Sequence, residues 1–385
     1  MGFHRGFVTG RLAVYLLAAA PAFATGITYT CDPSLSSAVC NTLNTTIAGL
    51  YSSTFTNANA SIYIQPGPVG LASSLQFYTN IDYTDYADKL IASESDADDI
   101  TAVASLGGDK TNPVNGSDGV AITSALAAIL GLANAADSLG TTTAGSFCTS
   151  PGAGACYNGV ITYSNLANTF YFRSGDQLNG TYDFYTAVEH ETDEILGTSS
   201  CIVGIDGTQE TSVNCLNGFG NNPPVGVSAA DLFRYTTARA RSYLNSANGS
   251  PAWFSIDGGT TAIANYHNSP DGPDYGDWDS AALRVQNAFG TMSVNGIDIT
   301  NDGGSEIRVL DAVGYTVVVA PEPGTAGLAA FSFLGAGWLK RRSSRKKSAK
   351  CAGSEDRSRI ASASRRGHWC PQAGIQFRLF LRDKK

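Results

Sequence analysis

The chain has 385 residues, of which 43% are hydrophobic and 15% are charged, and its formal net charge is −8. This composition excludes a disordered or fibrous chain, and the length allows one large domain or two ordinary ones. The charge is unevenly divided, because residues 340–385 carry 15 basic and 3 acidic side chains whereas the rest of the chain carries 10 and 30. We expect no nucleic-acid partner, because the acidic body would repel phosphates.

Residues 1–24 have the order of features that is typical of a secretory signal peptide. Arg5 and Arg11 precede the apolar run LAVYLLAAA, and small residues occupy the cleavage positions of PAFA. We therefore predict export by the Sec machinery, with cleavage after Ala24.

Residues 25–320 form the predicted mature body, in which helical and strand patterns are mixed. Apolar spacing predicts helices over 38–55, 83–92 and 122–137, and strands over 61–64, 159–164 and 169–172. No repeat of fixed period is visible. This order predicts one α+β domain.

Six cysteines lie in this body as three pairs of near neighbours: Cys31 with Cys40, Cys148 with Cys156, and Cys201 with Cys215. Exported proteins keep disulfides, so we predict that these neighbours are bonded, although other pairings are open. The absence of any C-x2-C spacing argues against a metal site built from four cysteines.

The segment 183–200, DFYTAVEHETDEILGTSS, carries the residues suited to catalysis. Its apolar positions predict a helix that ends at Gly197. On such a helix His190 and Glu194 are one turn apart, so both can bind one divalent metal ion. Glu191 then stands beside the ion as a general base, and Asp193 is a candidate partner that orients His190.

This segment resembles the HExxHxxG core of the metzincin-like zincins, with His190, Glu191 and Gly197 in register. Glu194 replaces the second histidine, and Ser200 stands where metzincins have a third. The HExDExLG variant, with DLFRY at 231–235, WFSIDGG at 253–259, DYGDW at 274–278 and EIRVLDAVGY at 306–315, looks like a family of predicted metalloproteases. The resemblance implies a zincin fold with a mixed sheet and an active-site helix, bound Zn²⁺, and hydrolysis of a protein or peptide substrate.

The third metal ligand stays open between two residues. Asp231 begins an apolar-aromatic run, where a buried carboxylate requires either a metal ion or an arginine partner. His267 is the only other histidine of the body and lies in a Gly/Pro/Asp-rich loop. Calcium is a second candidate cofactor, because four carboxylates crowd the same loop: Asp271, Asp274, Asp277 and Asp279.

Residues 321–347 combine Pro-Glu-Pro-Gly, an apolar stretch over 325–339 and a basic cluster. The stretch is shorter than the roughly 20 residues of a membrane span, but its basic stop suits a membrane-retained tail. The order resembles the PEP-CTERM sorting signal of Gram-negative bacteria, with a plain C-terminal anchor as the alternative. The resemblance implies processing by an exosortase, transient anchoring at the periplasmic inner membrane, and release to the cell surface or extracellular matrix.

Residues 348–385 are rich in Arg and Ser and show no periodicity. We interpret them as a basic disordered tail or as a read-through extension. For the body, the main prediction is a secreted zinc metalloprotease. The alternative is a catalytically degenerate zincin-fold surface or matrix protein with an adhesive role, which the replaced histidine and Ser200 favour. Glycan hydrolysis by paired carboxylates is a third reading that no spacing specifies.

Overall fold

The computed structural model describes residues 26–132, 139–176, 179–202, 226–242, 251–269 and 274–318. All of them belong to one unit of the chain, residues 1–319. The predicted signal peptide at 1–24, the sorting segment at 321–347 and the tail at 348–385 lie outside the described residues. Within the described ranges, no helix is long and apolar enough to cross a membrane.

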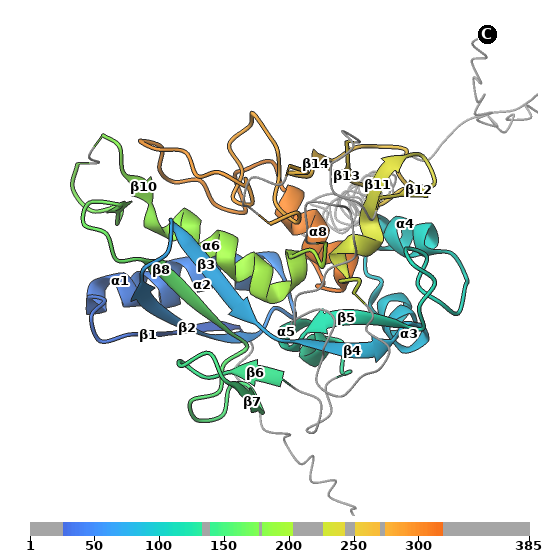
Figure 1. Cartoon of the computed structure of the whole chain (residues 1–385), viewed down its shortest axis with the longest axis horizontal. Helices are drawn as coiled ribbons and strands as arrows, with labels where there is room; N and C mark the ends of the chain where they lie inside the picture. Colours follow the sequence, from blue (N-terminus) through green and yellow to red (C-terminus); the bar gives the residue numbers. More distant parts are fainter. Residues whose placement is uncertain are drawn as a thin grey trace, which may run out of the picture. The chain divides into compact units, whose positions relative to one another are not determined.

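The main sheet has four strands in the order β1 (Ile27–Cys31), β2 (Ala60–Gly67), β8 (Gly159–Ser164) and β3 (Ala72–Gln76) (Figure 1). The first three are parallel, and β3 runs antiparallel to β8. Ile62, Ile64 and Ile161 are fully buried in this sheet, as expected for β-branched residues of inner strands. β3 is its last strand, so among the described residues one edge of the β3 backbone has no neighbouring strand.

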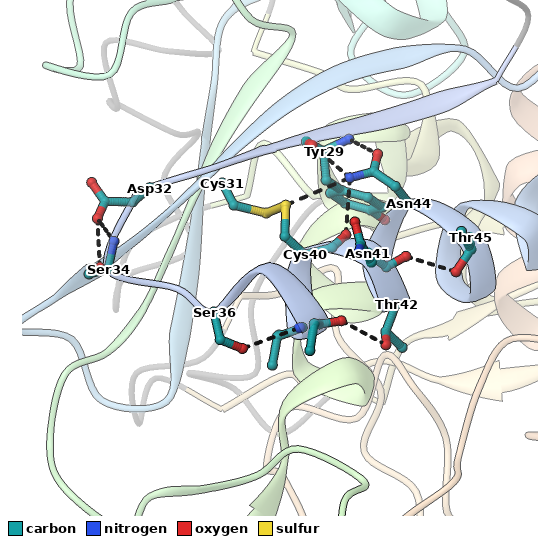
Figure 2. Close-up of a disulfide and its surroundings, with 12 residues drawn as sticks. Tyr29, Cys31, Asp32, Ser34, Ser36, Cys40, Asn41, Thr42, Asn44 and Thr45 are labelled. Carbon is teal, nitrogen blue, oxygen red and sulfur yellow. Dashed lines mark hydrogen bonds between the residues drawn. A yellow bond between two sulfur atoms is a disulfide. The ribbon is translucent and has the colours of Figure 1, made fainter.

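One long helical segment follows β1 and agrees with the helix predicted over 38–55. It consists of α1 (Ser37–Thr42), η1 (Leu43–Ile47) and α2 (Ala48–Thr54). The Cys31–Cys40 disulfide ties β1 to α1, and the Asn44 side chain bonds both the N–H and the C=O of Tyr29 at 2.9 Å (Figure 2). The strand and the helical segment are thus joined covalently and by hydrogen bonds.

The other predicted cysteine pairs have different outcomes. Cys148 and Cys156 form the expected disulfide, and Cys148 belongs to the hairpin of β6 (Leu139–Thr141) and β7 (Phe147–Thr149). Cys201 is also disulfide-bonded, and Cys215 lies outside the described residues.

The next elements are the antiparallel pair β4 (Tyr78–Asp82) and β5 (Gly119–Thr123) with helices α3 (Tyr83–Ser93), α4 (Ala97–Leu106) and α5 (Ser124–Ile129). The predicted helix 122–137 is wrong at its start, because residues 119–123 are a fully buried strand, and it is too long, because α5 ends at Ile129 and residues 130–132 are not helical. The Thr123 hydroxyl accepts a hydrogen bond from the Leu126 N–H and so begins α5 one residue later. Residues 133–138 lie outside the described residues.

The helix predicted at the motif is present. The short parallel pair β9 (Phe170–Tyr171) and β10 (Tyr182–Asp183) leads into α6 (Phe184–Asp193), which continues as η2 (Glu194–Thr198). Phe184 and Val188 are fully buried, and the Phe184 ring packs edge-to-face on Tyr163 of β8. Gly197 breaks the helical conformation inside η2 at φ 133°, which glycine adopts far more readily than other residues.

The last part of the unit packs over the end of α6. It contains η3 (Ala230–Phe233) and a small sheet in the order β12 (Ala240–Arg241), β11 (Arg234–Thr237), β13 (Trp253–Phe254) and β14 (Ala264–Asn265). The closing helix α8 (Ser305–Val313) buries Leu310 and Val313, and the Tyr315 hydroxyl donates to the Leu196 carbonyl at 3.0 Å. The chain is therefore a mixed α and β structure with several small sheets.

Candidate metal centre

The structure brings a third acidic side chain to the predicted pair on α6. His190 Nε2 lies 3.7 Å from Glu194 Oε1 and 3.4 Å from Asp277 Oδ1. One ligand atom from each of these three residues lies within 4.8 Å of the others. Two ligand atoms bound to one tetrahedral zinc at about 2.1 Å stand about 3.4 Å apart, so the observed spacing suits a shared ion.

The orientation of the His190 ring leaves one nitrogen facing the two carboxylates. Nδ1 lies 3.0 Å from the Val285 carbonyl, which can only accept, so Nδ1 carries the proton in the neutral ring. Nε2 is then an acceptor that faces the acceptor oxygens of Glu194 and Asp277. The Gln286 side-chain amide nitrogen lies 3.4 Å from His190 Nε2 and donates to Asp277 Oδ1, and a proton or a cation between the three acceptors would relieve their repulsion further. Backbone-held imidazoles of this kind are typical of metal ligands.

Asp277 reaches α6 because its loop approaches the helix end very closely. A Cβ on Gly276 would meet the Thr198 carbonyl oxygen at 2.8 Å and the Ser200 nitrogen at 2.9 Å, so only glycine fits there. On the other side of Asp277, Trp278 is buried and donates from Nε1 to Glu306 of α8 at 2.8 Å. These two contacts hold the loop on both sides of Asp277.

Hydrogen bonds fix both carboxylate ligands from outside the cluster. The Ser74 hydroxyl of β3 donates to Glu194 Oε2, and the Gln286 side chain donates to Asp277 Oδ1 at 2.9 Å. Gln286 is placed in turn by α8, because Glu306 accepts from its backbone N–H at 3.1 Å. The candidate ligands are therefore held by β3 on one side and α8 on the other.

Two further carboxyl groups, those of Glu191 and Asp274, crowd the centre. Glu191 is 5% exposed, and burial together with Glu194 raises the pKa of its carboxyl well above the ordinary value. Burial and Glu194 also raise the pKa of Asp274 well above normal and that of Asp277 to about 6. Burial alone would lower the pKa of His190, but Asp277 and Glu194 outweigh it and raise that pKa. One imidazole thus faces several acids, a charge balance that a divalent cation would improve.

The centre opens into a cavity of about 380 Å³. It is lined by His190, Glu191 and Glu194, by the segment from Leu71 to Ser74 at the start of β3, and by Leu283 and Phe289, which are 41% and 59% exposed. Polar and apolar side chains thus share one cavity, an arrangement common in ligand-binding sites.

The residues expected as third ligand lie elsewhere in the structure. The Asp231 carboxylate accepts from Ser200 Oγ at 2.6 Å and from the Cys201 and Ser228 N–H groups at 2.9 Å, so these three groups satisfy its buried oxygens. His267 is buried with its ring edge-to-face on Phe289. The group of candidate ligands contains Asp277 instead of either residue.

Two of the predicted residues contact the centre or its helix in other ways. The backbone N–H of His267 donates to the Asp277 carbonyl at 2.7 Å, so His267 positions Asp277 through its backbone. Asp193, expected to orient His190, instead accepts from the Tyr51 hydroxyl of α2 at 2.6 Å. The Val285 carbonyl bonds the His190 ring in its place. The expectation for Asp193 is therefore replaced by a backbone contact that the sequence did not reveal.

The carboxylate loop that suggested calcium divides in the structure. Asp277 joins the His190 group, and Asp274 lines the same cavity while its Oδ1 accepts from the Gly276 N–H at 2.6 Å. Asp279 is exposed, and Asp271 lies outside the described residues. The described part of this loop thus contributes to the His190 centre and forms no separate carboxylate group.

Comparisons with protein-family models, with curated proteins and with solved structures give no match for this chain. The site therefore has to be interpreted from its own geometry and chemistry.

Proposed function

We propose that this chain is a secreted zinc-dependent peptidase with a zincin-like fold. The observation that supports it most is the His190 Nε2 acceptor, which faces Glu194 Oε1 and Asp277 Oδ1 at 3.7 and 3.4 Å. One nitrogen and two carboxylate oxygens are a donor set that zinc accepts, and three protein ligands leave a position open for water or substrate.

The residues of the chain would divide the work as follows. His190, Glu194 and Asp277 would hold the zinc ion, which supplies a Lewis acid and a water of lowered pKa when bound. Glu191, which lines the cavity beside them, would accept a proton from the attacking water and deliver it to the leaving amine. Burial and Glu194 raise the pKa of its carboxyl, which favours the protonated form that delivers the proton to the amine.

The free edge of β3 supports a peptide as the substrate. Residues 71–74 of this segment line the cavity, and β3 has no further strand beside it among the described residues. An extended peptide could pair with that edge as an added strand, with alternate side chains entering the cavity. Leu71, Leu283 and Phe289 would then favour apolar side chains next to the cleaved bond.

Export remains part of the proposal. Two disulfides between described residues fit an oxidising compartment. The signal-like N-terminus, the PEP-CTERM-like segment and exosortase processing are proposed on the sequence alone. The alternative function is that of a degenerate, adhesive zincin-fold protein. Such a protein would fold in the same way but would not cleave peptides, so a measurement of catalysis distinguishes the two functions.

The test is hydrolysis of an unfolded protein such as casein by zinc-loaded wild type and by Glu191→Gln. We expect a loss of about 100-fold or more in kcat/KM with the zinc content unchanged. The matched control is Glu94→Gln at an exposed position of the same charge, which should cleave as fast as wild type. Equal cleavage by Glu191→Gln, or no cleavage by fully zinc-loaded wild type, would contradict the proposal.

A further inference from the structure

A second group of carboxylates lies away from the His190 centre, where α4 meets α8. One oxygen each from Asp96, Asp99 and Asp311 lies within 4.8 Å of the others. Asp96 is the N-cap residue of α4, Asp99 follows in the first turn, and Asp311 lies in the last turn of α8. The two helices therefore present three acids to one point.

Local hydrogen bonds hold the two acids of α4 in place. Asp96 Oδ1 accepts from the N–H groups of Asp98 and Asp99 at 2.8 and 3.1 Å. Asp99 Oδ2 accepts from the N–H and hydroxyl of Ser95 at 2.8 and 3.0 Å. These bonds are those of an ordinary helix N-terminus, so by themselves they indicate no ligand.

Asp311 is the observation that indicates one. This side chain is only 3% exposed, and its Oδ1 has no hydrogen-bond partner within the described part of the chain. Burying a carboxylate oxygen without a partner is costly, and two more acids beside it increase the cost. The nearby Arg308 does not relieve it, because its guanidinium pairs with Asp98 at 2.8 Å. The backbone N–H of Val317 is the hydrogen-bond donor to the Asp311 carboxyl, and a cation between the three acids would offset the repulsion that this one bond leaves.

We propose that Asp96, Asp99 and Asp311 bind a structural calcium ion. The donors are all carboxylate oxygens, which favour a hard cation over zinc. Oxygens bound to one calcium ion at about 2.3–2.6 Å stand up to about 5 Å apart, which accommodates the observed group. Asp96 is partly exposed, so water can complete the coordination, and we expect a Kd of about 0.1–1 mM, as in extracellular calcium modules.

The ion would connect α4 to the helix that supports the His190 centre. Asp311 lies near the end of α8, whereas Glu306 near its start bonds Trp278 and Gln286 on either side of the Asp277 contacts. Calcium would therefore stabilise the fold and the loop of Asp277 together. The inference does not depend on the proposed peptidase activity.

The experiment is thermal unfolding of the purified chain in chelator and in about 10 mM CaCl₂, with calcium titrated by calorimetry. We expect calcium to raise the Tm of wild type by roughly 2–5 °C. Asp311→Asn should remove that rise, yet in chelator it should be at least as stable as wild type because it removes a buried, repelled charge. The Tm difference between Asp311→Asn and wild type should therefore be zero or positive in chelator and negative in calcium. A damaged core would instead lower the Tm of the variant in both buffers.

Three further arms complete the test. Asp99→Asn, which keeps an oxygen for Ser95, should also remove the calcium response if Asp311→Asn does not fold. The exposed Asp88→Asn should respond like wild type, and so should Asp277→Asn, because it changes only the other centre. No calcium-dependent rise in wild type, an unchanged rise in both Asp311→Asn and Asp99→Asn, or its loss in Asp277→Asn would overturn the proposal.

Discussion

The two carboxylate groups of this molecule are built from similar residues but differ in donors and access. The His190 group includes an imidazole nitrogen and opens into a cavity of about 380 Å³. The Asp311 group contains oxygen donors only and lies between two helix ends. Because donor type and access select the metal and its role, we propose zinc and chemistry for the first group and calcium and stability for the second.

The largest expected effect comes from removing Asp277, the carboxylate ligand of the His190 group that comes from outside α6 and η2. Asp277→Asn should weaken zinc binding by at least about 100-fold and abolish hydrolysis, because it leaves His190 Nε2 with one carboxylate. Zinc affinity by competition with a chelating dye measures this effect. Asp279→Asn, an exposed acid of the same loop, should bind zinc normally. Normal zinc affinity in Asp277→Asn would contradict the assignment of zinc to the His190 group.

A smaller effect is expected at the serine behind Glu194. Ser74→Ala removes the hydroxyl that donates to Glu194 Oε2, and such outer partners of metal ligands are worth about 10–100-fold in affinity or activity. The same zinc titration and kcat/KM measure it, with Ser52→Ala, at an exposed position of α2, as the control. The calcium response should be unchanged in both. If Ser52→Ala and Ser74→Ala behaved alike, the Ser74 hydroxyl would have no role at the centre.

Gly276→Ala tests whether the close loop approach builds the zinc group. The new methyl group would meet backbone atoms of Thr198 and Ser200 at 2.8 and 2.9 Å, so we expect a loss of about 1–3 kcal/mol in unfolding free energy together with weaker zinc binding. Chemical denaturation measures the first quantity. Gly49→Ala in α2, where nothing lies within 4 Å, should be neutral or slightly stabilising. A stable Gly276→Ala that binds zinc normally would contradict the role given to this glycine.

The smallest effect is a pH dependence at the start of α8. Burial and Glu306 raise the pKa of Asp302 from 3.8 to about 8, so the folded state keeps its proton where the unfolded state loses it. Its contribution to stability is therefore full below about pH 4 and is lost as the pH rises toward 8. Asp302→Asn should flatten this part of the stability curve, measured in chelator. Curves of equal slope for both proteins would exclude the effect.

Of the His190 group, the sequence predicted the two residues that are close in the chain and missed the third, which is distant in the chain. His190, Glu191 and Glu194 follow from helical spacing, which depends only on neighbours in the chain. Asp277 could not be assigned in this way, because its place depends on the fit of Gly276 against the helix end and on the Trp278 bond to α8. The sequence marks Asp277 only as one of several acids in a loop.

The same limit applies to the fold. The helix over 38–55 and the strand over 159–164 were predicted because each has a clear period of its own. The strand β3, ASSLQ, has no β-branched residue to mark it. Residues 119–123 form a strand although the residues that follow them have a helical pattern, because all five are buried in the fold. The Asp311 group needs α4 packed on α8, so no pattern within either helix predicts it.

The central proposal is that one zinc ion binds at the His190 centre, and anomalous diffraction at the zinc absorption edge tests it most directly. From crystals of the zinc-loaded chain we predict one strong anomalous peak at about 2.0–2.2 Å from His190 Nε2 and from carboxylate oxygens of Glu194 and Asp277. No peak at this position, or zinc bound only at other residues, would contradict it.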